Sequence, residues 1–139
     1  MVHERMFDDD DPVLARVRAI ALGLPEAQEK VSHGRPAFFT TKVFAYYGGA
    51  LKVDGTWVQH AQSVVLQAPP DERAALRERA NSYVPGYLGP SGWTGLDLTE
   101  DTDWQELVEL IEIAYRETAP KRLVRALDSD ESTSRTKSD

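Results

Sequence analysis

Four basic residues gather around a glycine-proline bend in the first third of the sequence. They are Lys30, His33, Arg35 and Lys42. The glycine before Arg35 lets the chain turn sharply and the proline after it holds Arg35 extended, so the bend predicts the start of a strand with bases at its mouth. Clustered bases of this kind suit contact with an anion such as a phosphate.

A second basic group is expected on the outer face of the last helix, where Lys121, Arg122 and Arg125 could also meet an anion. Aromatic side chains that could stack on bases or anchor a peptide are Trp57, Tyr83, Tyr87 and Trp93. The structural alternative is strong, because tryptophans at strand starts and tyrosines around a Pro-Gly turn commonly form the edge of a core. The sequence alone leaves both interpretations open.

Residue spacing gives catalysis little support. Ser32 precedes His33, but adjacent residues of an extended chain point to opposite faces, so they do not form a nucleophile-base pair. The three histidines lack the spacing that places two metal ligands on one helix turn. We predict a protein that is not an enzyme, with no catalytic residue, metal ligand or cofactor. An enzyme that uses His33 with Glu26 or Glu29 stays a third hypothesis, and it requires a titrating group held in a pocket.

The amino-acid composition limits the kinds of protein that this chain can be. The 139 residues are 41% hydrophobic, enough for one domain with a core. Cysteine is absent and no stretch resembles a signal peptide or a membrane span, so we expect a cytoplasmic protein without membrane contact, as a monomer or weak dimer. The formal net charge of −7 opposes general affinity for nucleic acid, so any DNA contact must use a local basic patch.

Hydrophobic periodicity predicts the first half of the fold. A helix begins at Pro12, capped by the acidic run Asp8–Asp11, and ends at Gly23. We expect Gly48-Gly49 and Asp54-Gly55 as tight turns of an antiparallel meander. The segments expected to be extended are Ala37–Thr40, Val43–Tyr47, Leu51–Val53, Thr56–Val58 and Ser63–Gln67.

The second half predicts more helix. A helix is expected from Pro70 to about Asn81, a shaped loop over 83–91 and a last strand over 92–98. Asp103 and Glu106 match a capping box before the clearest helical stripe of the chain. A short helix, Lys121–Leu127, follows.

The expected order is a helix, three or more antiparallel strands, a helix, one or two strands, a helix and a short helix. This order predicts an α+β fold, a two-layer single domain with an antiparallel sheet. The domain is expected over residues 12–127, between a flexible acidic N-terminus (1–11) and a disordered tail (128–139) rich in serine, threonine and charge.

A set of short motifs, in order along most of the chain, resembles the MmcQ/YjbR-like family. The motifs are Leu22-Gly-Leu-Pro-Glu-Ala27, His33-Gly-Arg-Pro-Ala-Phe38, Lys42-Val-Phe-Ala45, Val84-Pro-Gly-Tyr87, Gly92-Trp93, and Ala114-Tyr115 through Ala119-Pro120-Lys121. The resemblance implies a compact domain with the order α-β-β-β-α-β-β-α, similar in outline to secretion-chaperone folds. It also implies a customary description as a double-wing DNA-binding protein, with no established enzymatic activity.

Two departures from the family pattern bear on DNA binding. Where many relatives are basic just before the tryptophan, this chain has Gly89-Pro-Ser-Gly92, which removes a phosphate contact. The meander between Gly49 and Gln62 is also longer than usual. Our first hypothesis is a non-enzymatic domain that binds DNA through the hairpin Lys42–Val58 and the bend bases. The alternative is a protein- or small-ligand-binding module that uses a cleft near Tyr87 and Trp93.

Overall fold

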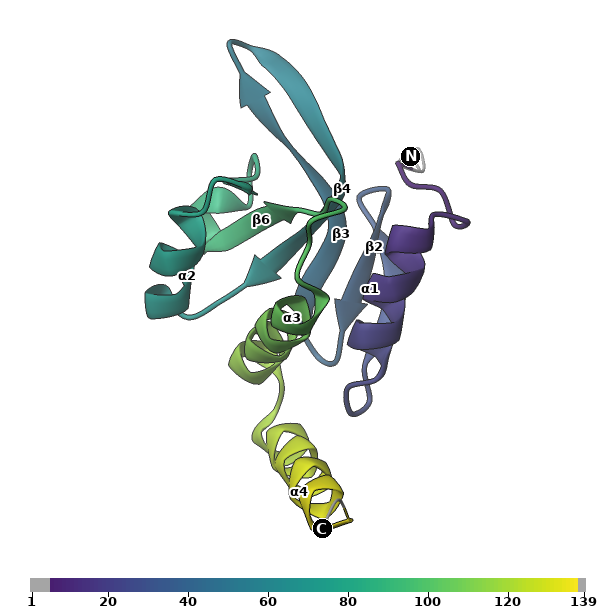
Figure 1. The fold of residues 1–139 in the computed structure, drawn as a ribbon. Coiled ribbons are helices and arrows are strands. Elements are labelled where there is room, and N and C mark those ends of the chain that lie inside the picture. The colour runs from purple at the N-terminus through teal and green to yellow at the C-terminus, as the bar shows by residue number, and fades with distance from the viewer. Residues whose placement is uncertain (1–5, 138–139) are drawn as a thin grey trace.

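The computed structural model describes residues 6–137, with side chains described through residue 129. Six strands and four α-helices follow one another along the chain (Figure 1). In order they are α1 (Pro12–Leu22), β1 (Gln28–Ser32), β2 (Arg35–Phe39), β3 (Val43–Val53), β4 (Thr56–Gln67), α2 (Pro70–Arg77), β5 (Ser82–Tyr83), the short 3-10 helix η1 (Gly89–Ser91), β6 (Trp93–Asp97), α3 (Trp104–Thr118) and α4 (Lys121–Lys137). The α+β class and the predicted order of elements are confirmed, with one additional strand, β1.

The six strands form one antiparallel sheet in the order β1-β2-β3-β4-β6-β5. Strand β1 occupies a segment for which the sequence predicted no strand, and a His33-Gly34 turn with φ angles of 54° and 80° joins it to β2. Charged residues on β1 suit a strand at the sheet edge, where they discourage pairing with another chain.

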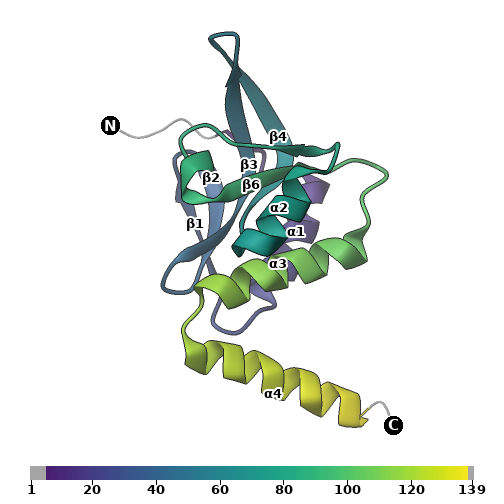
Figure 2. The ribbon, with the colours of Figure 1, turned by 90° about the vertical axis from the view of Figure 1, so that its left-hand side faces the viewer.

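Strands β3 and β4 make a long hairpin that projects beyond the rest of the sheet (Figures 1 and 2). Asp54 and Gly55 form its turn, as predicted, with φ angles of 51° and 80°. The predicted turn at Gly48-Gly49 is wrong, because both residues lie inside β3 where the register with β4 shifts. Glycines at that place serve a bulge and a close contact rather than a chain reversal.

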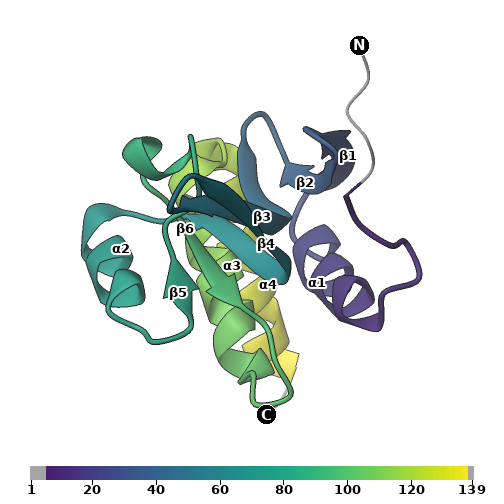
Figure 3. The ribbon, with the colours of Figure 1, turned by 90° about the horizontal axis from the view of Figure 1, so that it is seen from above.

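The core lies between one sheet face and the helices α1 and α3, which lie on the same side of the sheet (Figure 3). Phe44 of β3 meets Tyr115 of α3 edge-on, with ring centroids 5.4 Å apart. The Tyr115 hydroxyl donates to the Pro25 carbonyl at 2.7 Å, which ties the C-terminal half of α3 to the segment after α1. Helix α2 packs at the β5–β6 edge.

The predicted helix starts are confirmed by their hydrogen bonds. Asp11 accepts from the Val13 amide at 2.9 Å and Asp103 accepts from the Glu106 amide at 3.1 Å. The Tyr47 hydroxyl also donates to Asp11 at 2.5 Å. These bonds lower the pKa of Asp11 despite the opposing effect of its burial.

The structure describes residues 6–11 and 128–137 of the two terminal segments. Residues 1–5 and 138–139 lie outside the described residues, but the Met6 amide donates to the Gly34 carbonyl at 2.8 Å. Helix α4 continues to Lys137 instead of ending at Leu127, and Asp128 pairs with Arg116 at 2.8 Å. Extending a helix from packed turns is easier than nucleating one, which polar composition alone does not reveal. No helix within residues 6–137 combines the length and apolar run needed to cross a bilayer.

Candidate binding face of the sheet

One register row crosses the whole sheet on the face opposite α1 and α3. It consists of Lys30, Ala37, Tyr46, Val65 and Gly95, each paired with the next, and it ends at Tyr83 of β5. Ala37 and Val65 are buried but do not belong to the core cluster that the helices cover. We call this side of the sheet the open face. The name includes the projecting β3–β4 hairpin, residues 48–61, and the rings that lie on it.

Aromatic rings line the centre of the open face. Tyr46 and Trp93 are half-buried, with ring centroids 5.3 Å apart and planes tilted by 60°. The ammonium group of Lys30 lies 4.7 Å from the centroid of the Phe39 ring. A cation over a ring gains electrostatic attraction while its charge stays accessible.

A second pair of rings lies on the projecting hairpin. Trp57 of β4 and Tyr87 of the following loop have centroids 5.4 Å apart, and the Lys52 ammonium lies 5.4 Å from the Trp57 ring. Tyr87 is 84% exposed. The Gly86 amide donates to the Ala50 carbonyl at 2.8 Å, and a side chain at Gly86 would begin 2.6 Å from the Trp57 ring. Glycine is therefore required where this loop meets the hairpin.

The arginine Arg77 of α2 holds the loop that carries these rings. Its guanidinium donates to Thr94 Oγ1 and to the carbonyls of Gly89 and Trp93, each at 3.1 Å. Sequence reasoning did not assign Arg77 to the site, because an arginine late in a short helix is expected to face solvent. The bonds join α2 to both sides of η1 and so fix Trp93 in place.

Arg35, which we expected at the surface, is 9% exposed. Its guanidinium donates to the Gln59 side chain and lies so close to Gly48 that a Cβ there would be 2.5 Å from Nη1. Burial lowers the pKa of Arg35. Arg35 therefore braces the base of the β3–β4 hairpin, and Gly48 makes room for it.

A polar cluster lies beneath the hairpin on the same face. His60 Nδ1 donates to Asp97 at 2.6 Å, and the His60 ring stacks on Tyr83 with centroids 4.0 Å apart. The Tyr83 hydroxyl is hydrogen bonded to Ser63 at 2.7 Å. Burial raises the pKa of Tyr83 to about 12, the Asp97 charge contributes, and the Ser63 bond opposes the rise. Sequence reasoning missed this cluster because its members are far apart in the chain.

The structure does not unite the other predicted site residues. His33 lies in the exposed β1–β2 turn and Lys42 lies exposed before β3. Lys121, Arg122 and Arg125 lie on α4, a different element from the bend. Arg122 pairs with Glu26 at 2.6 Å, so a protein carboxylate already meets that charge.

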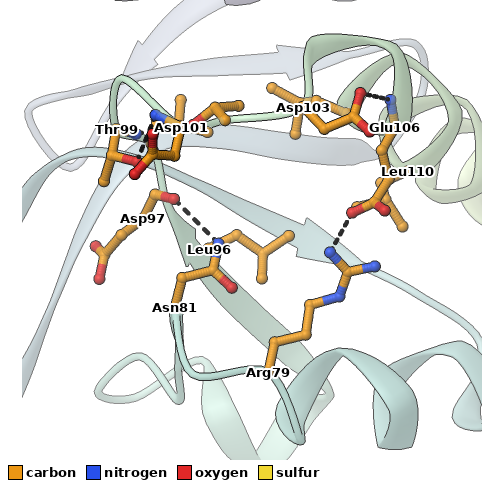
Figure 4. A pocket seen from close by; sticks show the side chains of 12 residues that line it. Arg79, Asn81, Leu96, Asp97, Thr99, Asp101, Asp103, Glu106 and Leu110 are labelled. Carbon is orange, nitrogen blue, oxygen red and sulfur yellow. Dashed lines mark hydrogen bonds and ion pairs between the residues drawn. The ribbon is translucent and has the colours of Figure 1, made fainter.

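A cavity of about 390 Å³ lies between β6, the α2–β5 connection and the start of α3. In Figure 4 Arg79 reaches across it to Glu106, with which it forms an ion pair, while the Asp97 carboxylate points away. None of the predicted site residues lines this cavity. Within the described residues, no group of three His, Asp or Glu side chains is placed to hold a metal ion.

The charge of the open face differs from that of the whole chain. Glu29 and Asp97 are the only acidic residues in the six described strands. Glu29 is paired in register with Phe38 of the core, so it faces the helices, and it binds Arg18 of α1 at 2.9 Å. Asp97 is bound to His60. The other described carboxylates belong to helices, turns and connections.

The sequence was compared with models of known protein families, and one family matches. The sequence model of the YjbR family, described only as YjbR, matches residues 22–117, which contain all six strands. No curated protein sequence matches the chain.

Proposed function

Because the chain belongs to the YjbR family, we propose that it is a non-enzymatic DNA-binding domain whose contact surface is the open face of the sheet. DNA binding is also what the resemblance described above implies. The proposal keeps the hairpin of our first hypothesis as the main contact element. Of the four bend bases it keeps Lys30, and it adds Lys52; both lysines are exposed.

The charge distribution carries this proposal. Lys30 and Lys52 lie beside aromatic rings of the open face, and neither forms an ion pair within the described residues. The described carboxylates of this face are Asp97, which accepts a hydrogen bond from His60, and Asp54 at the hairpin tip. Neither forms an ion pair with Lys30 or Lys52 within the described residues, so a phosphate chain would meet a positive charge at each lysine despite the net charge of −7.

Fluorescence anisotropy with a labelled DNA duplex across a salt series tests the proposal. We expect measurable binding at low salt and a steep loss as salt rises, because each neutralised phosphate contributes about −0.9 to the log–log slope. The double variant Lys30→Gln/Lys52→Gln should weaken binding on the order of ten-fold and reduce the slope by about 1.8.

The matched control is Lys121→Gln/Arg125→Gln, which removes the same charge from exposed positions on α4. It should leave the affinity and the slope within experimental error of the parent. Absence of binding at low salt contradicts the proposal. An equal loss in the two double variants contradicts the assignment of the open face.

A second candidate function is protein binding through Trp57 and Tyr87. The observation that favours it is Tyr87, which exposes 84% of its surface beside a second aromatic ring. Exposed aromatic pairs are typical anchors of protein interfaces. Binding through these rings should persist at high salt, whereas binding to phosphates should not.

A further inference from the structure

The rings of the open face divide into two groups along the hairpin. Tyr46 with Trp93 forms the inner group, and Trp57 with Tyr87 forms the outer one. Trp57 is paired in register with Lys52, six residues along β3 from Tyr46. The two groups therefore lie at different levels of the hairpin, and the loop that carries Tyr87 and Trp93 connects them.

The supply of free cations limits the kind of DNA that the face can hold. Four arginines, Arg18, Arg79, Arg116 and Arg122, pair with carboxylates of the protein itself. Arg77 donates to carbonyl groups and Arg35 is buried. Affinity for duplex DNA comes mainly from neutralising many phosphates, and two lysines neutralise few.

Stacking offers affinity that needs little charge. Stacking of one base on an aromatic ring increases the affinity on the order of ten-fold, whichever base it is. The base can stack in this way only when it is not paired with a second DNA strand. A lysine near a stacking ring could meet the phosphate that follows a stacked base. Lys52 lies at Trp57 of the outer group, and Lys30 lies at Phe39, in the same register row as Tyr46 of the inner group.

From this arrangement we infer that the open face binds single-stranded DNA, with bases stacked on the Tyr46–Trp93 and Trp57–Tyr87 groups and phosphates near Lys30 and Lys52. This inference rests on the proposed function and adds the form of DNA that is bound. It predicts little sequence preference, because every base presents a ring face for stacking.

Three labelled probes of equal length test the inference: a ten-nucleotide thymidine strand, the same length of duplex, and an abasic strand with the same phosphate charge. The parent protein should bind the thymidine strand at least ten-fold more tightly than the abasic strand, and more tightly than the duplex. Equal or tighter binding of the duplex, or equal binding of the abasic strand, overturns the inference while leaving DNA binding intact. No binding of any probe at low salt overturns the proposed function and this inference together.

The variant Tyr87→Asn removes the aromatic ring and keeps the backbone conformation at this position. Tyr87 has a φ of +64°, a conformation that asparagine tolerates well, and its side chain is largely exposed, so the fold should be unaffected. Affinity for the thymidine strand should fall on the order of ten-fold, while affinity for the abasic strand should not change. Tyr87→Phe keeps the ring and should keep the affinity. Loss in the phenylalanine variant equal to that in the asparagine variant overturns the stacking role.

Discussion

Arg35 gives the sharpest distinction between a contact residue and a structural brace. The structure buries its guanidinium at the hairpin base, so Arg35→Ala should destabilise the fold. Two lost methylene groups cost about 0.8 kcal/mol each, and the lost hydrogen bond to the exposed Gln59 residue costs about 1 kcal/mol. Relief of a desolvated charge returns part of this, which leaves a net loss of about 2 kcal/mol.

The companion variant Arg35→Met separates packing from charge. Methionine keeps the length of the side chain and removes the charge that burial disfavours, so the loss should be below about 1 kcal/mol. Urea denaturation followed by tryptophan fluorescence measures both variants. For a chain of this size, 2 kcal/mol corresponds to a fall in Tm of roughly 6–10 °C.

Two results would refute this account of Arg35. One is a methionine variant that is as unstable as the alanine variant, since the charge would then be stabilising in itself. The other is an alanine variant of normal stability that no longer binds DNA, since Arg35 would then be a contact residue as the sequence first suggested.

Two further predictions concern the loop that carries the aromatic rings and the stability at high pH. Arg77→Ala removes three hydrogen bonds around η1, so amide hydrogen exchange should become faster at Gly89–Trp93 while the amides of β3 stay protected. Faster exchange throughout the protein would show that Arg77 stabilises the whole fold instead. Tyr83 is held protonated, with a pKa raised to about 12, so it contributes stability that is complete below pH 10 and is lost as the pH rises toward 12. Tyr83→Phe should therefore flatten the loss of stability between pH 10 and 12, measured by urea denaturation, and an unchanged slope would contradict this assignment.

Local signals predicted the helix starts well. Asp103 and Glu106 fix a cap through atoms three residues apart, and Asp11 caps α1 directly before a proline. Such contacts are encoded within a few residues, so the sequence contains all that determines them.

The predictions were wrong where contacts between distant parts of the chain determine the conformation or the burial of a residue. Gly48 and Gly49 look like a turn, but the close approach of Arg35 to Gly48 explains its glycine, and β4 continues the pairing on both sides of the shift. The burial of Arg35 itself depends on Gln59, 24 residues away. The aromatic residues Trp57, Tyr87 and Trp93 were identified from the sequence, but Tyr46 was not. Which ring contacts which depends on the tertiary fold, which the sequence did not specify.

Titration of the ¹⁵N-labelled protein with the ten-nucleotide thymidine strand tests the central claim most directly, because its three tryptophans provide an internal control. Trp57 and Trp93 lie on the open face, whereas Trp104 lies at the start of α3 with Arg16 over its ring. If the open face binds DNA, the indole N–H resonances of Trp57 and Trp93 shift and that of Trp104 does not. A shift confined to Trp104, or no indole shift while the DNA binds, would contradict the account.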